Sequence, residues 1–186
     1  MMSNASSKGS KKKTENVMRQ IRVAKVTLNI GTGKEKSALE RGSKLIKHIT
    51  GMDPVVTKTN KRIPGWGLRP GLSIGCKLTL RGKEAEALLE RLLHAKDKKL
   101  SRKQFDNEGN FAFGIPEYID IQNIKYNPEI GITGLEVAVT LERPGFRIKR
   151  KKIGSSIIPR KHRISREEAA AFIASKFNVK MQEDEE

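Results

Sequence analysis

The sequence has little of what secreted, membrane-spanning and metal-binding proteins need. It contains one cysteine, Cys76, which excludes an internal disulfide and any multi-cysteine metal site. No apolar run approaches the ~20 residues needed to cross a bilayer, and residues 1–16 hold no hydrophobic segment of the kind found in secretory signals. These absences predict a cytoplasmic location and no membrane partner.

Arrangements of side chains that support catalysis are also lacking. The histidines lie in separate segments, and none has a partner at metal-ligand spacing. The glycines of Gly31-Thr-Gly-Lys34 suggest a phosphate loop, but GxxxxGK[ST] would need glycine in place of Leu28 and Ser or Thr in place of Glu35. We therefore interpret residues 31–34 as a tight strand-to-helix turn, and we expect no cofactor, no metal and no enzymatic activity.

Acidic residues are scarce beside basic ones. There are 21 Asp and Glu against 38 Lys and Arg, a net charge of +17. No acid at all occurs from Pro54 to Lys83 or from Arg143 to Arg163. Thermophile surfaces carry many charges, but with balanced signs. The imbalance therefore indicates a partner rich in phosphate.

Hydrophobic periodicity predicts an α+β fold. Alternation indicates strands at 22–31, 54–59, 73–81, 118–122 and 133–142. Apolar residues at helical spacing indicate helices at 34–50, 83–95 and 165–177, the last opened by the capping box Ser165-Arg-Glu-Glu168. Half-polar strands predict an antiparallel or mixed sheet of about five strands, with helices packed on one face and the other face polar and basic. We expect a disordered basic tail at 1–16, one RNA-binding domain at 17–178 and an acidic tail at 179–186.

The uncovered sheet face is the first candidate RNA surface. Its expected side chains are Lys25, Thr27, Asn29, Lys77, Thr79 and Arg81. A polar, basic sheet face is a common surface for binding RNA.

The segment NKRIPGWGLRPG, residues 60–71, is the second candidate, because it places the only tryptophan, Trp66, between two glycines. Prolines and glycines there predict an irregular loop. One interpretation makes Trp66 a hydrophobic plug that folds the loop back onto the domain. The other makes it a stacking platform, which contributes about 1–3 kcal/mol per base. Lys61, Arg62 and Arg69 favour contact with nucleic acid.

A third candidate is the basic segment 143–163, RPGFRIKRKKIGSSIIPRKHR, which we expect to be an extended loop. A solvated loop or a localisation signal are alternatives. Its length and interleaved apolar residues favour a segment that RNA phosphates order. The cations expected to contact RNA are Arg147, Lys149, Arg150, Lys151, Lys152, Arg160, Lys161 and Arg163.

Several stretches resemble the large-subunit ribosomal protein five family, which binds 5S rRNA. They are VAKVTLNIGTG, VVTKTNKRIPGWGLRPGLSIGCKLTLRG, FDNEGNFAFGI, NPEIGITGLEVAVTLERPGF and KHRIS, and the similarity runs from Arg19 to Phe177. TLNIG together with GxxxRPGxxIGCKLTLRG is a long and specific signature. The RPGF…KHRIS segment is similar to the archaeal and eukaryotic branch, and we favour the archaeal side.

The resemblance implies an antiparallel sheet with helices on one side, and a place in the central protuberance of the cytoplasmic ribosome. It implies that the sheet surface around Lys25 contacts 5S rRNA, and that the loop at 61–71 reaches P-site tRNA. The further partners implied are large-subunit rRNA, other 5S-associated ribosomal proteins and a small-subunit head protein across an intersubunit bridge, with 106–116 as the candidate bridge region. The residues that match the 5S rRNA surface of the family are Thr27, Asn29, Thr57, Lys58, Thr59, Lys77, Thr79 and Arg81.

Two other functions remain as alternatives. An RNA-binding module that acts away from the ribosome would use the same face, and would bind unrelated structured RNAs with comparable affinity. A nucleotide-dependent enzyme would use the turn at 31–34, and its ATP binding would be abolished by Lys34→Ala.

Overall fold

The computed structural model describes residues 16–182, so most of the predicted basic tail and the last four residues of the acidic tail lie outside the described residues. Its centre is an antiparallel sheet with the strand order β2-β3-β1-β6-β5. The strands are β1 Arg22–Gly31, β2 Val55–Lys58, β3 Ser73–Leu80, β5 Phe111–Ile115 and β6 Leu135–Glu142. This confirms the predicted α+β fold and its five-stranded sheet.

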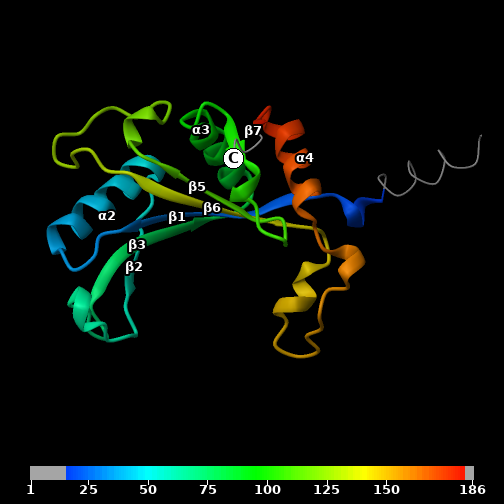
Figure 1. Ribbon diagram of the computed structural model, residues 1–186, viewed down its shortest axis with the longest axis horizontal. Helices are drawn as coiled ribbons and strands as arrows, with labels where there is room; N and C mark the ends of the chain where they lie inside the picture. The colour runs from blue at the N-terminus through cyan, green and yellow to red at the C-terminus, as the bar shows by residue number, and fades with distance from the viewer. Residues whose placement is uncertain (1–15, 183–186) are drawn as a thin grey trace, which may run out of the picture.

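Three α-helices cover one face of the sheet (Figure 1). They are α2 Lys36–Thr50, α3 Lys83–His94 and α4 Arg166–Phe177. Two features predicted from the sequence set their ends: Gly51 closes α2 in the left-handed conformation, and the Ser165–Glu168 capping box opens α4. None of the helices in residues 16–182 has the length and apolar character needed to span a membrane.

The core lies between the sheet and the helices. The alternate residues Val26, Leu28 and Ile30 of β1 are buried there. Cys76 is buried beside them, and this burial raises the pKa of its thiol, which confirms it as a core residue. An added Cβ at Gly42 of α2 would lie 3.2 Å from the Cys76 Sγ, so the helix packs closely on the sheet.

A β-bulge corrects the predicted alternation at the start of β1. Val23 pairs with Leu141 and Lys25 pairs with Thr140, which leaves Ala24 as the extra residue. Val23 is therefore buried in the core, whereas simple alternation would place Ala24 there. The bulge leaves Lys25 on the polar face, as the sequence predicts.

The predicted strand at 118–122 is wrong. Tyr118–Asp120 is a 3-10 turn in which the Ile121 amide donates to the Tyr118 carbonyl at 3.2 Å. The three-residue spacing buries both Tyr118 and Ile121, while Ile119 is exposed. The fifth strand is instead β5, where Phe111, Phe113 and Ile115 alternate into the core.

Two other segments also differ from simple expectation. A short parallel pair joins β4, Lys99–Ser101, to β7, Lys180–Gln182, so part of the segment expected as an acidic tail is a strand. The basic segment at 143–163 is folded, with 3-10 turns at Phe146–Arg150 and Arg160–His162. Together with the β2–β3 loop, it projects from the uncovered side of the sheet (Figure 1). The uncovered face therefore lies between two projections.

Candidate nucleic-acid interface

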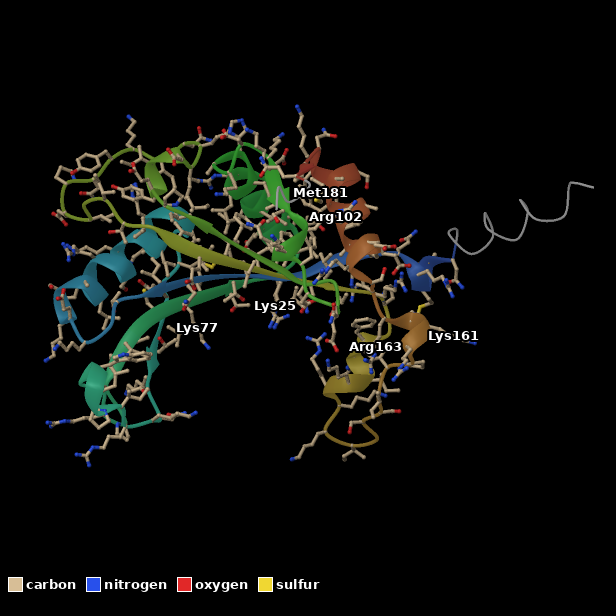
Figure 2. The ribbon with its side chains drawn as sticks, viewed as in Figure 1. Lys25, Lys77, Arg102, Lys161, Arg163 and Met181 are labelled. Carbon is tan, nitrogen blue, oxygen red and sulfur yellow. The ribbon has the colours of Figure 1, made fainter. Side chains whose placement is uncertain are left out.

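Strand register gathers the predicted polar residues on the uncovered face. Thr27 of β1 lies opposite Thr79 of β3, and their hydroxyls are 3.2 Å apart. Asn29 lies opposite Lys77, and Lys25 lies opposite Thr140 of β6. We call the face that carries Lys25, Thr27, Asn29, Lys77 and Thr79 the open face, and Lys25 and Lys77 lie on its side in Figure 2.

The open face carries positive charge that no ion pair among the described residues neutralises. Lys25 and Lys77 have no ion-pair partner among residues 16–182, and neither has Arg81, which directly follows β3. One acid lies among them, Glu136 of β6, and it accepts a hydrogen bond from the Asn29 amide at 3.0 Å. The free cations and side-chain dipoles suit a backbone of phosphates and 2′-hydroxyls.

Strand β2 contributes less to this face than the resemblance implies. Thr57 pairs with Gly75, and an added Cβ at Gly75 would lie 3.1 Å from the Thr57 Oγ1, so Thr57 belongs to the open face. Lys58 is exposed beyond a register shift. Thr59 is buried, and its hydroxyl donates to the Lys61 carbonyl and accepts from the Lys61 amide. Thr59 therefore shapes the loop.

The β2–β3 loop, residues 59–72, presents Trp66 to solvent. Ile63 and Leu68 exchange two backbone hydrogen bonds of 3.1 Å, which close a tip made of residues 64–67. The tryptophan is 71% exposed on this tip, so it is not a hydrophobic plug. The predicted loop cations, Lys61, Arg62 and Arg69, are exposed as well.

The turn at 31–34 adds one cation to the loop. Gly33 adopts φ +62°, as expected for a tight turn between strand and helix. An added Cβ at Gly67 would lie 3.8 Å from Lys34 Cδ and 3.9 Å from its Nζ. Lys34 therefore lies against the loop tip, a placement that sequence spacing did not indicate.

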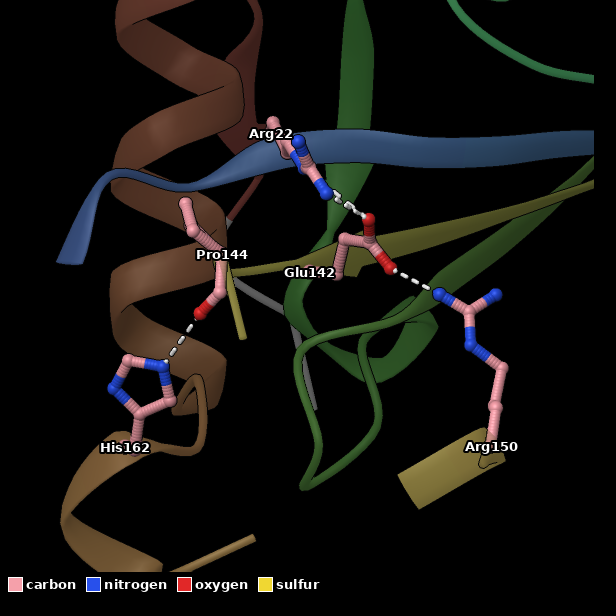
Figure 3. A network of polar contacts seen from close by, with 5 residues as sticks. All are labelled: Arg22, Glu142, Pro144, Arg150 and His162. Atoms are coloured by element: carbon pink, nitrogen blue, oxygen red, sulfur yellow. Dashed lines mark hydrogen bonds and ion pairs between the residues drawn. The ribbon is translucent and has the colours of Figure 1, made fainter. Parts of the chain in front are cut away.

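Two buried polar groups attach the basic segment to the domain. Glu142, at the end of β6, accepts from Arg22 at 2.6 Å and from Arg150 at 2.9 Å (Figure 3). The side chain of Arg143 is 5% exposed, pairs with Glu168 at 2.9 Å and donates to the carbonyls of residues 162 and 163. The segment is therefore a fixed projection.

All eight cations predicted to contact RNA in this segment are exposed, but they are not equally available. Arg150 binds Glu142, while Lys149 and Arg163 lie 3.6 and 4.0 Å from Glu108. The others have no ion-pair partner in the described part of the chain; they are Arg147, Lys151, Lys152, Arg160 and Lys161.

The Arg143–Glu168 pair predicts a pH dependence of stability. Burial alone would raise the pKa of Glu168, but the Ser165 amide and the Arg143 guanidinium outweigh it, so the pKa of this carboxyl is lowered. A lowered pKa stabilises the fold above the unfolded pKa of about 4.3, and this stabilisation is lost as pH falls through the folded value. Glu168→Gln should remove that part of the acid dependence.

Urea unfolding from about pH 6 down to about pH 3 would check this prediction. The wild type should lose more free energy of unfolding over this range than Glu168→Gln does. Glu167→Gln is the matched control, because it makes the same charge change one residue away, at a side chain that forms no ion pair with Arg143. Equal pH profiles for the two variants would contradict the assignment.

The residues that organise the interface are the ones that sequence reasoning missed. Arg22, Glu142 and Arg143 hold the basic segment, and Lys34 joins the loop. Only their position in the sequence could have indicated this role, because Glu142 and Arg143 come directly after the alternating apolar residues of β6. Residues 16–182 contain no group of histidines, cysteines and acids arranged to hold a metal ion.

Comparison with known proteins places the chain in a family. A family model for the C-terminus of the ribosomal protein L5 family matches residues 73–180, and one described as Ribosomal protein L5 matches residues 16–69. The large ribosomal subunit protein uL5 of Nanoarchaeum equitans is 46% identical over 90% of this chain and 99% of its own length.

Two other archaeal relatives with the same name agree over similar spans. That of Sulfolobus acidocaldarius is 45% identical over 90% of this chain and 94% of its own length. That of Methanobrevibacter smithii is 42% identical over 88% of this chain and 96% of its own length. The family is a structural component of the ribosome and not an enzyme. The chain therefore belongs to the ribosomal protein L5 family, in its archaeal branch.

Proposed function

This protein is a structural constituent of the large ribosomal subunit, and we propose that its open face binds 5S rRNA and anchors it in the central protuberance. The observation that carries the proposal is the uncovered sheet face itself. It combines the Thr27–Thr79 hydroxyl pair with Lys25, Lys77 and the adjoining Arg81, which have no ion-pair partner among residues 16–182. A domain with no partner has no need for such an uncompensated face.

Binding of this kind positions the RNA and involves no chemistry. Lys25, Lys77 and Arg81 neutralise phosphates, and the release of counterions supplies affinity. Hydroxyl and amide side chains of the strands then bond 2′-hydroxyls and base edges in the wide, shallow minor groove of RNA. The two projections beside the face limit which RNA shapes fit between them (Figure 1).

The basic segment extends the same role. The five cations of this segment that have no ion-pair partner in the described part of the chain contact large-subunit rRNA, while Glu142 and Arg143 fix their position. In the ribosome of the cytoplasm, the protein then joins 5S rRNA to the rest of the subunit, beside other 5S-associated proteins.

The β2–β3 loop contacts P-site tRNA in this proposal. Trp66 is exposed on the tip, with Lys34, Lys61, Arg62 and Arg69 around it. An exposed aromatic ring with nearby cations fits the stacked bases and phosphates of a tRNA elbow. The candidate for the contact with a small-subunit head protein is the region 106–116, in which residues 112 and 114 of β5 are exposed.

Replacing the loop tip should separate the two RNA contacts. Exchanging Pro64-Gly-Trp-Gly67 for Asn-Gly keeps the Ile63–Leu68 pairing and closes it with a two-residue hairpin turn. Affinity for 5S rRNA should then stay within about twofold, while tRNA binding at the P site of reconstituted ribosomes should fall about tenfold, since stacking contributes roughly 1–3 kcal/mol. Filter binding would measure both, with Trp66→Ala as the single-residue comparison. Loss of 5S rRNA binding would show that the loop contacts 5S rRNA itself.

A salt titration of binding tests the main proposal. The affinity of the protein for 5S rRNA is compared with that for a structured RNA of the same length and unrelated sequence. With about six phosphates neutralised, log K should fall with log salt with a slope of roughly −4 to −5. A preference for 5S rRNA that survives high salt supports the proposal. Equal affinities that fall together would favour the alternative, an RNA-binding module that acts away from the ribosome.

A further inference from the structure

A cavity lies where the open face meets the basic segment. Its volume is about 600 Å³. Lys25, Arg81 and Thr140 line it from the sheet side, and Phe146 and Ile158 line it from the basic segment. The projection of residues 143–163 therefore encloses space against the sheet, and the size falls within the range of about 300–1,000 Å³ that small ligands occupy.

The walls of this cavity differ in character. Phe146, Ile157 and Ile158 form an apolar side, and Ile157 is 81% exposed although it has an apolar side chain. Asn110, Thr140 and the serines at 155 and 156 also line it and supply hydrogen-bonding groups. An apolar wall beside polar groups suits a flat heterocycle that needs both stacking and edge contacts.

The charge of the cavity favours an anion. Its two acids are already engaged: Glu142 binds two arginines, and Glu108 lies within 4.0 Å of Lys149 and Arg163. Lys25 and Arg81 have no such partner among residues 16–182. The free positive charge therefore lies on the sheet side, across from the apolar wall.

We propose that this cavity receives a single unstacked nucleotide of the bound RNA. Its base lies against Phe146, Ile157 and Ile158, and its phosphate lies on Lys25 and Arg81. The volume fits one nucleotide and no duplex, so the site selects RNA that carries an extruded or looped-out residue. This inference rests on the proposed function and specifies how one part of the interface reads RNA structure.

Chemical-shift titration of the full-length protein with AMP, GMP, CMP and UMP tests the site without any RNA. Ribose 5-phosphate and inorganic phosphate at matched ionic strength are the base-free probes. We expect nucleotide-dependent shifts in the amides of Asn110, Thr140 and residues 155–158, larger than those with either base-free probe. Arg81→Ala should weaken nucleotide binding about threefold, as expected for one exposed charge contact. The control Arg41→Ala, at an exposed arginine of α2, should leave it unchanged.

Two variants and one competition complete the test. Ser156→Phe fills the cavity from an exposed position and should abolish the shifts without unfolding the domain. Saturating 5S rRNA should also abolish them, because the RNA supplies its own nucleotide. Equal shifts with inorganic phosphate would overturn the nucleotide assignment and leave an anion site only, and absent shifts or shifts that persist in the RNA complex would overturn the proposal. The nucleotide titrations do not depend on 5S rRNA affinity. The competition uses a 5S rRNA concentration at which binding, measured separately as in the salt titration, is saturated, so a failure of this inference is distinguishable from a failure of 5S rRNA binding.

Discussion

Reversing three cations that have no ion-pair partner among residues 16–182, by Lys25→Glu, Lys77→Glu and Arg81→Glu together, should lower the affinity for 5S rRNA by about 100-fold at ~0.15 M salt. Each phosphate contact contributes a factor of roughly 5 at this salt concentration, through the release of about 0.8 counterion. Three lost contacts give the expected change, and repulsion by the new carboxylates adds to it. The slope of log K against log salt should flatten by about 2 to 3.

The matched control reverses three exposed cations on the helical side of the sheet: Lys36→Glu, Arg41→Glu and Lys83→Glu. It changes net charge equally, and none of the three has an ion-pair partner in the described residues. Long-range attraction falls alike in both variants, so the difference between them isolates direct contact. Equal losses of affinity would mean that RNA binds net charge and not the open face.

Much of the fold could be predicted from local pattern. In β1, β3 and β6 one side chain in two faces the core, so composition alone separates a buried face from a polar one. The pattern fails where backbone geometry breaks the period. The bulge at Ala24 reverses the alternation of the residues before it, so Val23 faces the core. The 3-10 turn at Tyr118 buries two residues that are three positions apart. Neither deviation has a signature in residue type.

The sequence predicts where the cations of the candidate site lie, but not which of them form ion pairs within the protein. Exposed cations on polar strand faces follow from alternation, so Lys25 and Lys77 lie where the sequence puts them. Which cations remain unpaired depends on acids brought from elsewhere in the chain. Glu108 and Glu142 engage three cations of the basic segment, and no local spacing links Glu142 to Arg22, which is 120 positions away.

Arg143→Ala should lower the free energy of unfolding by about 3 kcal/mol, because it removes a buried charge that makes three polar contacts. The guanidinium bonds the carbonyls of residues 162 and 163 and pairs with Glu168, so it joins the end of β6, the end of the basic segment and the start of α4. Urea unfolding measures the change. Arg143→Lys should recover part of it, since an ammonium keeps the charge without the planar fork.

Arg160→Ala is the control, an exposed arginine of the same segment that should change stability by less than about 0.5 kcal/mol. If Arg143→Ala were as stable as this control, the apolar contacts of Ile158 and Ile164 would be holding the segment alone. If Arg143→Ala is destabilised as expected, Arg143 stabilises the fold, whereas the neighbouring cations of the acid-free segment 143–163 are available to bind RNA. The charge of Arg143 faces inward and fixes the backbone, and that fixed backbone holds the other cations in place for RNA.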